Sequence, residues 1–499
     1  MSRKVFYNGI ADGALLFAGI VSSVVLTRLL GPDRWGKYSQ MIWLINFSAM
    51  LAGFGLTYTS MRFIANLSGA NDKANLKLLV KWILIAQLIL ALLSSALVFL
   101  FSDRLIALTS WQVNSSLVRV TSFGIFSYTL LQLGNAMLRG LQEFRYLSLV
   151  SICSGGLFLS AILVVILRPG VSSLIISISL GQLLLLPWIF SKVWSRVIRD
   201  GQPPMSGLPG IWKSVLSYTI IIFFTTLIDQ IVWQRSEIFF LARLPDPSHT
   251  GFYSLSYTIS QLAIGTVPVA LTGILTPVFS SIIASNPGSN MNHLYERSFS
   301  YLNLILLPST IGLIVVAPKL VALLYGEEFQ PAVPALQIIA ISTALGIYTR
   351  PGTSVLHALN KPLVLLLAGL AALPVDLVLA WRLIPGMFAR GAAIANLAAQ
   401  LVCAALIVGY GIFRVGLRVN LDSLAKTLFS SIICGIVAEL ILLLEIDPLF
   451  TLPLAIVVAS ISYLFLLMFL KDEPTIDILI ILKRMVFNLF REAQHLFIS

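Results

Sequence analysis

The sequence predicts an all-α polytopic membrane protein with about 14 transmembrane helices. Of its 499 residues, 58% are hydrophobic and only 11% are charged, whereas soluble domains average about 45–50% and about 25%. The apolar residues gather into long segments that approach the about 20 residues needed for a bilayer-spanning helix. A third observation is an internal repeat of six segments. So few charges cannot cover a chain of this length in water, which excludes an ordinary soluble protein.

Short connections with turn-forming residues, such as Gly31-Pro32 and Asp447-Pro448, separate the apolar segments. The segments fall near residues 10–30, 39–63, 79–101, 115–138, 147–167, 171–193, 214–243, 252–282, 298–317, 332–357, 362–384, 391–413, 424–444 and 451–470. Because the number of spans is even, both ends of the chain are expected on the same side.

The positive charge supports this topology. The chain carries a formal net charge of +12. If the N-terminus is inside, 22 of the 33 Lys and Arg residues fall on the inside, and cytoplasmic loops are rich in these residues. We therefore expect both termini in the cytoplasm, and we attribute the charge to topology, with no nucleic acid as a partner.

A duplication divides the chain. Residues 26–39 (LTRLLGPDRWGKYS) and 241–254 (LARLPDPSHTGFYS) match at seven of fourteen positions with an offset of 215. The matches are Leu26/Leu241, Arg28/Arg243, Leu29/Leu244, Pro32/Pro247, Gly36/Gly251, Tyr38/Tyr253 and Ser39/Ser254. Spans 1–6 are thus predicted to repeat as spans 7–12. Because six is even, the repeat is parallel, and such halves form two lobes around a central cavity.

The domain boundaries follow from the repeat and from a Pro/Gly-rich interruption. We expect an N-terminal six-helix lobe over 1–194, a cytoplasmic linker over 195–213, a C-terminal six-helix lobe over 214–413, two extra C-terminal helices over 414–470, and an amphipathic cytoplasmic tail over 471–499.

Polar residues within the apolar segments are the candidate functional residues, because charge inside a bilayer costs about 2.5–3.5 kcal/mol per residue. The deep carboxylates Asp12, Asp229, Glu237 and Asp376 are candidates for ion coupling. The amides Asn46, Gln230, Gln234 and Gln261 lie on polar helical stripes, which favours a wet cavity, although small polar residues also hold helices together. The arginines are Arg28, Arg62, Arg235, Arg243 and Arg350, and those near segment ends could instead extend to the membrane surface.

Signs of catalysis are missing from the sequence. The 3 cysteines and 4 histidines are scattered, and no motif resembles a phosphate-binding loop, a nucleophile elbow or a zinc site. We therefore predict no catalytic residue, no metal and no cofactor, and we expect an ion gradient to supply energy.

Five motifs carry a resemblance to a known family. They are RLLGPDRWGKYS (28–39), AGFGLTYTSMRFIA (52–65), RGLQEFRY (139–146), KLVALLYGEEFQPAVPALQIIAI (319–341) and LIPGMFARGAAIA (383–395). Together they resemble the O-antigen flippase branch of the multidrug/oligosaccharidyl-lipid/polysaccharide (MOP) exporter superfamily. The resemblance implies alternating access between two lobes in a bacterial inner membrane. It implies, as substrate, an oligosaccharide linked to undecaprenyl pyrophosphate.

The resemblance also implies site roles. In such families cavity arginines attract the pyrophosphate, and here Arg28 and Arg62 lie in the matching motifs, with Arg243 as the repeat mate of Arg28. Arginine holds phosphate through paired, charge-assisted bonds, and amides suit sugar hydroxyls. The predicted substrate-binding set is Arg28, Arg62, Asn46, Gln230, Gln234, Arg235, Arg243, Gln261 and Arg350. The expected partners are membrane lipid, a coupling proton or sodium ion, a polysaccharide polymerase and glycosyltransferases.

Two other functions stay open. A small-molecule antiporter of the related multidrug-extrusion group would typically have twelve spans, so the extra pair argues against it. A membrane-embedded polysaccharide polymerase or acyltransferase would need a large external loop or an embedded histidine constellation, and the sequence shows neither.

Overall fold

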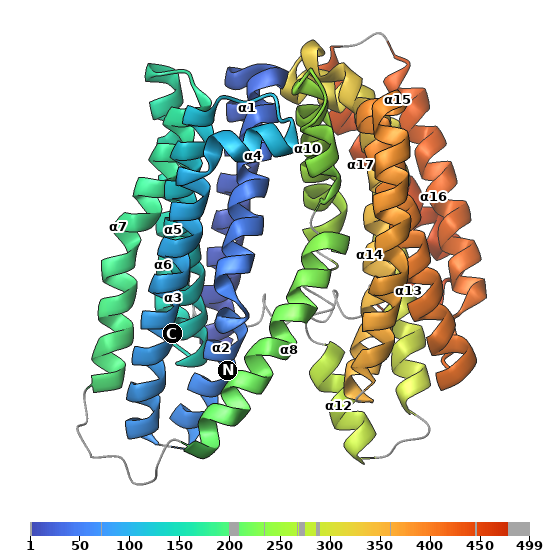
Figure 1. Cartoon of the computed structure of the whole chain (residues 1–499). Coiled ribbons are helices and arrows are strands. Elements are labelled where there is room, and N and C mark those ends of the chain that lie inside the picture. The colour runs from blue at the N-terminus through green and yellow to red at the C-terminus, as the bar shows by residue number, and fades with distance from the viewer. Residues whose placement is uncertain are drawn as a thin grey trace, which may run out of the picture. The chain divides into compact units, whose positions relative to one another are not determined.

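The computed structural model is built from helices (Figure 1), and it describes residues 2–70, 72–198, 209–233, 235–266, 268, 275–285, 290–359, 361–444 and 447–477. The chain divides into two compact units. The first comprises Met1–Ser254 and Ile384–Ala389, and the second comprises Leu255–Leu383 and Arg390–Ser499. Most of the predicted linker at 195–213 and most of the predicted tail at 471–499 lie outside the described residues.

The first unit contains nine described helices and the first part of a tenth. They are α1 (Ser2–Gly53), α2 (Leu56–Gly69), α3 (Lys73–Leu100), α4 (Ser102–Thr109), α5 (Ser115–Gly140), α6 (Phe144–Leu167), α7 (Val171–Ile198), α8 (Pro209–Trp233), α9 (Glu237–Leu241) and α10 (Ser248–Ser260).

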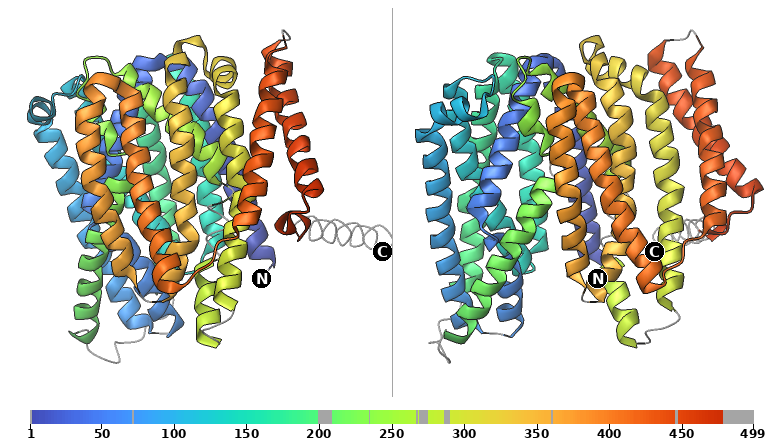
Figure 2. Two further views of the ribbon diagram at one scale, coloured as in Figure 1. Left: turned by 90° about the vertical axis from the view of Figure 1, so that its right-hand side faces the viewer. Right: turned by 45° about the vertical axis from the view of Figure 1, so that its right-hand side comes forward.

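The second unit contains the helices that follow. They are η1 (Gln261–Gly265), α12 (Leu275–Ser285), α13 (Asn290–Tyr325), η2 (Glu327–Ala332), α14 (Val333–Ala358), α15 (Pro362–Tyr410), η3 (Gly411–Val415), α16 (Leu421–Leu442) and α17 (Pro448–Phe469). Figure 2 shows α16 and α17 side by side, as their short connection requires.

Several helix ends are set by local chemistry. The side chains of Asp72, Asn420 and Asp447 accept hydrogen bonds from the first-turn amides of α3, α16 and α17, which satisfies donors that the helix itself leaves free. Proline occupies the first position of α15 and α17, where its missing N–H costs nothing.

The first long helix is broken twice by glycine. Gly31 has φ 69° inside α1, so two helices meet there, and Gly55, at φ 75°, separates α1 from α2. The predicted second span at 39–63 is therefore two helical pieces, bent by 50°. Left-handed φ values favour glycine because it lacks a Cβ atom.

Eight helices of the described chain are long and apolar enough to cross a membrane, or nine if the bent pair is counted as one span. The eight are Lys73–Leu100, Phe144–Leu167, Val171–Val197, Met291–Tyr325, Glu327–Ala358, Pro362–Val415, Leu421–Leu442 and Pro448–Phe469. The predicted segments at 362–384 and 391–413 both lie within Pro362–Val415, but they are separate helices, because α15 is interrupted at Phe388 (φ 52°, ψ −128°), where two helices meet. The fold is therefore an all-α, multi-span membrane protein.

The outward faces of these helices are apolar. Large hydrophobic side chains are exposed along α3, α6, α16 and α17, including Leu93, Leu163, Ile436 and Phe465. In water such patches are rare in monomeric proteins. Against lipid they carry no penalty, so the exposed surface agrees with membrane burial.

Inside the first unit, α5 is the central helix. Sixteen of its residues are buried, and its neighbours include Ile64 on α2, Leu79 on α3 and Ile189 on α7. Small residues let these helices approach closely: a Cβ atom on Gly134 would lie 2.7 Å from Ile189 Cγ2.

The two repeated motifs cross each other in the first unit. A Cβ atom on Gly36 would overlap the carbonyl oxygen of Pro247, and one on Gly251 would lie 2.5 Å from the carbonyl oxygen of Pro32. Gly36 and Gly251 are equivalent under the predicted repeat, as are Pro32 and Pro247. Beside the crossing, Gln40 Nε2 donates a buried hydrogen bond of 3.1 Å to Thr250 Oγ1. The two backbones are thus in direct contact, and no side chain would fit between them.

This crossing predicts the effect of a single methyl group. Gly36→Ala and Gly251→Ala should each lower the melting temperature of the purified protein by several degrees, because the backbones must separate to admit a Cβ atom. Gly19→Ala, on the same α1 helix, is the control, since a Cβ atom there meets nothing within 4 Å. Melting temperatures that are equal for all three variants would contradict the crossing.

Candidate functional site

A pocket of about 470 Å³ lies within the first unit. Its walls come from α1, α2, α5 and α8. The lining residues are Asn46, Ala49, Met50, Gly53, Gly55, Thr57, Tyr58, Met61, Tyr128, Thr129, Gln132, Asn135, Ala136, Arg139, Thr226 and Gln230. Among these described residues Arg139 carries the sole charge, and none is acidic. The other polar groups are amides, hydroxyls and two tyrosines, which suits a polar, hydroxyl-rich or anionic ligand.

One face of α5 supplies the polar wall. Tyr128, Gln132, Asn135 and Arg139 follow each other at spacings of four, three and four residues, so they share one side of the helix. Gln132 Nε2 donates to the hydroxyl of Tyr128 over 2.6 Å, which orients both side chains. Arg139 is exposed in the last turn of α5, where the helix dipole favours a cation.

Asn135 presents an unused acceptor to this pocket. Its Oδ1 atom is buried and accepts no hydrogen bond from any group that the structure describes. Buried carbonyl oxygens are almost always hydrogen-bonded. A hydroxyl of a ligand, or a water molecule, would satisfy this oxygen. The pocket therefore offers a hydrogen-bond acceptor one helical turn from the cation Arg139.

The break between α1 and α2 shapes the opposite wall. At Gly55 a Cβ atom would lie 2.6 Å from the carbonyl oxygen of Thr219 on α8, so the backbones of α2 and α8 touch there. Behind the break, the buried Gln87 side chain donates 2.9 Å to the carbonyl oxygen of Ala52, a group that the interrupted helix leaves without an internal partner. This geometry places Thr57 and Tyr58 at the pocket.

Aromatic and hydroxyl contacts hold α8 against α2. Phe54 and Phe223 stack with ring centroids 4.5 Å apart, and Thr59 Oγ1 lies 2.9 Å from Thr219 Oγ1. Thr219 already donates to the carbonyl oxygen of Val215, so Thr59 is the donor between the two hydroxyls.

The structure brings two of the predicted substrate-binding residues together. Asn46 and Gln230 both line the pocket, and Asn46 Nδ2 donates 2.9 Å to the carbonyl oxygen of Ile42. The role of these two residues in substrate binding stays a prediction.

The remaining predicted binding residues lie elsewhere. The Arg62 guanidinium stacks on Tyr218, 4.3 Å from the ring centroid, and does not line the pocket. Arg235 lies between α8 and α9 at φ 60°. Arg28 on α1 and Arg243 after α9 are exposed parts of the first unit. Gln261 in η1 and Arg350 in α14 belong to the second unit. Gln234 lies outside the described residues.

Two of the predicted coupling carboxylates, Glu237 and Asp376, are not among the described lining residues of the pocket. Glu237 in α9 and Asp376 in α15 are each 1% exposed, in the first and second units respectively. Asp12 lies in α1 and Asp229 in α8, and their side chains lie outside the described part of the chain.

Sequence reasoning missed the α5 face. Gln132, Asn135 and Arg139 were not among the candidates, although their helical spacing within the segment at 115–138 and at its end was a readable signal. The motif at 139–146 begins with Arg139. Beyond it, Glu143 forms ion pairs with Lys192, over 3.7 Å, and with Arg196, which ties the end of α5 to α7.

Metal ligation finds no support in the side chains that the structure describes: no three His, Cys, Asp or Glu residues lie close enough to hold an ion.

Comparison with known proteins establishes the family. The family model described as "Polysaccharide biosynthesis protein" (Polysacc_synt_3) matches residues 25–334. The chain belongs to this family.

Three relatives show how far the similarity extends. An uncharacterized membrane protein in the cps region of Klebsiella pneumoniae is 22% identical, over 72% of this chain and 71% of that protein. The succinoglycan biosynthesis transport protein ExoT of Rhizobium meliloti is 23% identical, over 69% and 66%. The lipopolysaccharide biosynthesis protein WzxC of Escherichia coli is 27% identical, over 24% of each chain.

Solved structures show the same fold. The lipid II flippase MurJ, in an inward closed conformation, matches with a TM-score of 0.75 at 15% identity, covering 93% of this chain and 99% of that one. An inward-facing multidrug resistance MATE family transporter of the MOP superfamily matches with a TM-score of 0.64 at 18% identity, covering 81% and 94%. The chain therefore is a multi-pass membrane protein of the polysaccharide biosynthesis family, and its fold resembles those of the MurJ flippase and the MATE transporter.

The contact between α2 and α8 yields a testable prediction. Thr59→Val and Thr219→Val should each destabilise the purified protein, and the double variant should lose less than the sum, because both remove one shared hydrogen bond of about 1 kcal/mol. Thermal unfolding in detergent measures the cycle. Strictly additive losses would show that the two hydroxyls do not interact.

Proposed function

We propose that this chain is a flippase that moves lipid-linked oligosaccharide or polysaccharide repeat units, carried on undecaprenyl pyrophosphate, across a bacterial inner membrane. Its family is one of polysaccharide biosynthesis, and its fold resembles a lipid II flippase over almost the full chain. The names of its relatives connect three different glycans, succinoglycan, lipopolysaccharide and teichuronic acid, with membrane proteins of this kind.

The observation that carries the proposal is the composition of the pocket in the first unit. Its amides and hydroxyls donate to and accept from sugar hydroxyls, while Tyr58 and Tyr128 offer flat faces to sugar rings. Arg139 is a fixed cation with a planar donor fork that matches a phosphate. A pocket with no acidic side chain among its described lining residues repels no anion, whereas an extruder of cationic drugs would need the opposite charge.

The proposed topology has fourteen spans with both termini in the cytoplasm. Lobes at 1–194 and 214–413 are joined by the linker at 195–213, with helices 13 and 14 at 414–470 and an amphipathic tail at 471–499. Alternating access would expose a central cavity between the lobes first to one side and then to the other. Arg28, Arg62, Arg235, Arg243, Arg350, Gln234 and Gln261 are proposed to line that cavity together with Asn46 and Gln230.

An ion gradient is proposed to drive turnover. Asp12, Asp229, Glu237 and Asp376 are acidic groups in apolar segments, and carboxylates at membrane depth commonly serve proton or cation relays. A polysaccharide polymerase and glycosyltransferases would act on the same lipid-linked material before and after it crosses.

The first prediction of this function concerns Arg139. In a bacterial strain that lacks its own flippase and accumulates lipid-linked glycan, Arg139→Gln should reduce export at least tenfold, and Arg139→Lys should restore only part of it, because lysine keeps the charge but loses the paired bonds. Arg168→Gln is the control. Arg168 is exposed at the end of α6 and lines neither of the two cavities of the first unit.

Export of surface glycan and protein level by immunoblot measure this effect. Normal export by Arg139→Gln at wild-type protein level would reject the pocket as the substrate site.

The second prediction concerns coupling. Asp229→Asn should stop turnover in proteoliposomes while substrate binding stays within about twofold of wild type, because the amide cannot exchange a proton. Transport that is unchanged when both proton and sodium gradients are collapsed would contradict ion coupling.

A further inference from the structure

A second cavity, of about 150 Å³, lies in the first unit and shares no residue with the polar pocket. Its lining is almost wholly apolar and comes from α1, α4, α5, α9 and the turn after α4. The residues are Trp43, Leu44, Phe47, Leu105, Ile106, Thr109, Trp111, Val118 and Phe239. The one aliphatic hydroxyl, on Thr109, is already used, since it donates to the carbonyl oxygen of Leu105 over 2.6 Å.

Four aromatic rings give this cavity a fixed shape. Trp43 and Phe47 stack almost parallel, with centroids 5.1 Å apart and an angle of 6°. Trp111 stands nearly edge-on to Trp43 at 6.0 Å and to Phe239 at 6.2 Å. These four rings pack against one another, and Leu44, Leu105, Ile106 and Val118 supply the aliphatic part of the lining of this apolar slot.

The short helix α4 closes the slot from outside. It runs across the longer helices of the first unit (Figure 1), and two bonds anchor it to α5. Arg119 Nε donates 3.0 Å to Ser102 Oγ, and its Nη2 atom lies 2.7 Å from Asp103. The hydrogen bonds from Ser115 and Arg119 hold the pKa of Asp103 below its usual value, so this anchor stays charged near neutral pH. Leu108 on the outer side of α4 is 78% exposed, as expected of a helix that meets lipid.

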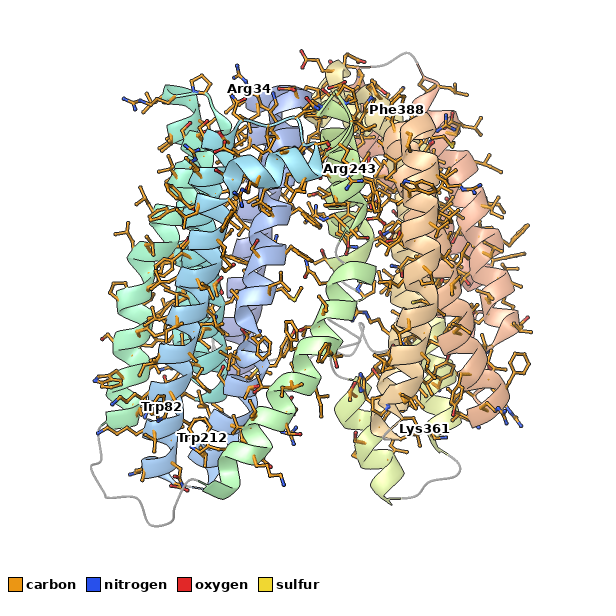
Figure 3. The ribbon with its side chains drawn as sticks, viewed as in Figure 1. Arg34, Trp82, Trp212, Arg243, Lys361 and Phe388 are labelled. Atoms are coloured by element: carbon orange, nitrogen blue, oxygen red, sulfur yellow. The ribbon has the colours of Figure 1, made fainter. Side chains whose placement is uncertain are left out.

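A cation lies at the edge of the slot. The guanidinium carbon of Arg243 lies 4.7 Å from the centroid of the Phe239 ring. Phe239 itself lines the cavity. Arg243 is exposed, and Figure 3 labels it. An apolar slot with an exposed guanidinium at its edge is complementary to an amphiphile that carries a hydrocarbon chain and an anionic head.

We propose that this slot binds an isoprene unit of a polyprenyl phosphate, with the phosphate beside Arg243. The assignment rests on the proposed function and adds to it a site for the lipid part of the substrate, apart from the pocket for the glycan. A dry cavity of this volume accepts a molecule the size of benzene, and one five-carbon isoprene unit has a similar bulk. Its planar double bond can pack against the aromatic rings of the slot, and its methyl branch against the aliphatic side chains. A straight acyl chain is narrower, and it would leave part of the wall without contact, which forfeits dispersion energy.

Photolabelling of the purified full-length protein in nanodiscs tests this site. The probe is geranylgeranyl phosphate with a diazirine near the end of its chain, and labelled peptides are mapped by mass spectrometry. Label is expected within residues 39–47 and 101–118. Unlabelled geranylgeranyl phosphate should compete at least tenfold better than hexadecyl phosphate, which has the same head on a straight chain.

Matched variants make the test specific. Ile106→Trp fills the slot and should reduce labelling at least tenfold. Leu105→Phe adds less side-chain volume and should also reduce labelling. Leu108→Trp places the same new ring on the outer side of α4 and should label like wild type. Arg243→Gln should weaken competition by geranylgeranyl phosphate several-fold and leave competition by uncharged geranylgeraniol unchanged. Melting temperatures confirm that each variant is folded.

Three results would overturn the proposal: label confined to other segments, labelling that survives both slot-filling variants, or equal competition by hexadecyl phosphate, which would indicate a general acyl-chain site. Arg139→Gln should still label normally, since Arg139 lines the other pocket. If Arg139→Gln did not reduce glycan export, that result would count against the proposed function alone. Failure of the proposed function and failure of the lipid site are therefore distinguishable.

Discussion

The backbone crossing of Gly36 and Gly251 is the contact on which the geometry of the first unit depends. At this point two carbonyl oxygens occupy the places where Cβ atoms would stand, so the two segments cannot slide by a residue without driving a neighbouring side chain such as Trp35 or Lys37 into the partner backbone. The crossing therefore sets the register of α1 against the chain that enters α10. Because Gly36 and Gly251 are equivalent under the repeat, one duplicated motif supplies both sides of the contact.

The register of α1 at this crossing determines the positions of both cavities. Trp43, Asn46 and Phe47 follow the crossing along α1, within three turns of Gly36, and they divide between the two sites: Asn46 lines the polar pocket, and the two aromatic residues line the apolar slot. The break at Gly55 then turns the chain so that α2 meets α8. A change of register at the crossing would rotate α1 by about 100° per residue, and it would exchange the faces that these side chains present.

Much of this could be predicted from the sequence, and the rest could not, for physical reasons. Low charge and long apolar segments reliably indicate bilayer-spanning helices, and the motif order indicated the family that the comparison established. Asn46 and Gln230 were singled out because they lie on polar helical stripes within apolar segments, and both line the pocket. The Tyr128–Arg139 face has a readable helical spacing, but the sequence could not show that this face lines a pocket, because the other walls come from α1, α2 and α8, which lie far away in the chain. The contact of the Arg62 guanidinium with the ring of Tyr218 was not predictable from its motif, and the substrate-binding role of Arg62 stays a prediction.

The polar pocket and the apolar slot of the first unit share no residue, and this separation matters for an amphiphilic substrate. A glycan and a polyprenyl chain cannot share one cavity without leaving either hydroxyls in an apolar wall or methylene groups against amides, and both arrangements are unfavourable. Two cavities remove this conflict when each has its own cation, as Arg139 lines the polar pocket and Arg243 stands at the apolar slot. The diphosphate between sugar and lipid is then the part of the molecule that either guanidinium can hold. On this argument the lipid chain is bound by a surface that makes no contact with sugar, so recognition of the carrier is independent of glycan composition. One fold can therefore serve relatives associated with chemically different polysaccharides, with the variable contacts restricted to the polar pocket.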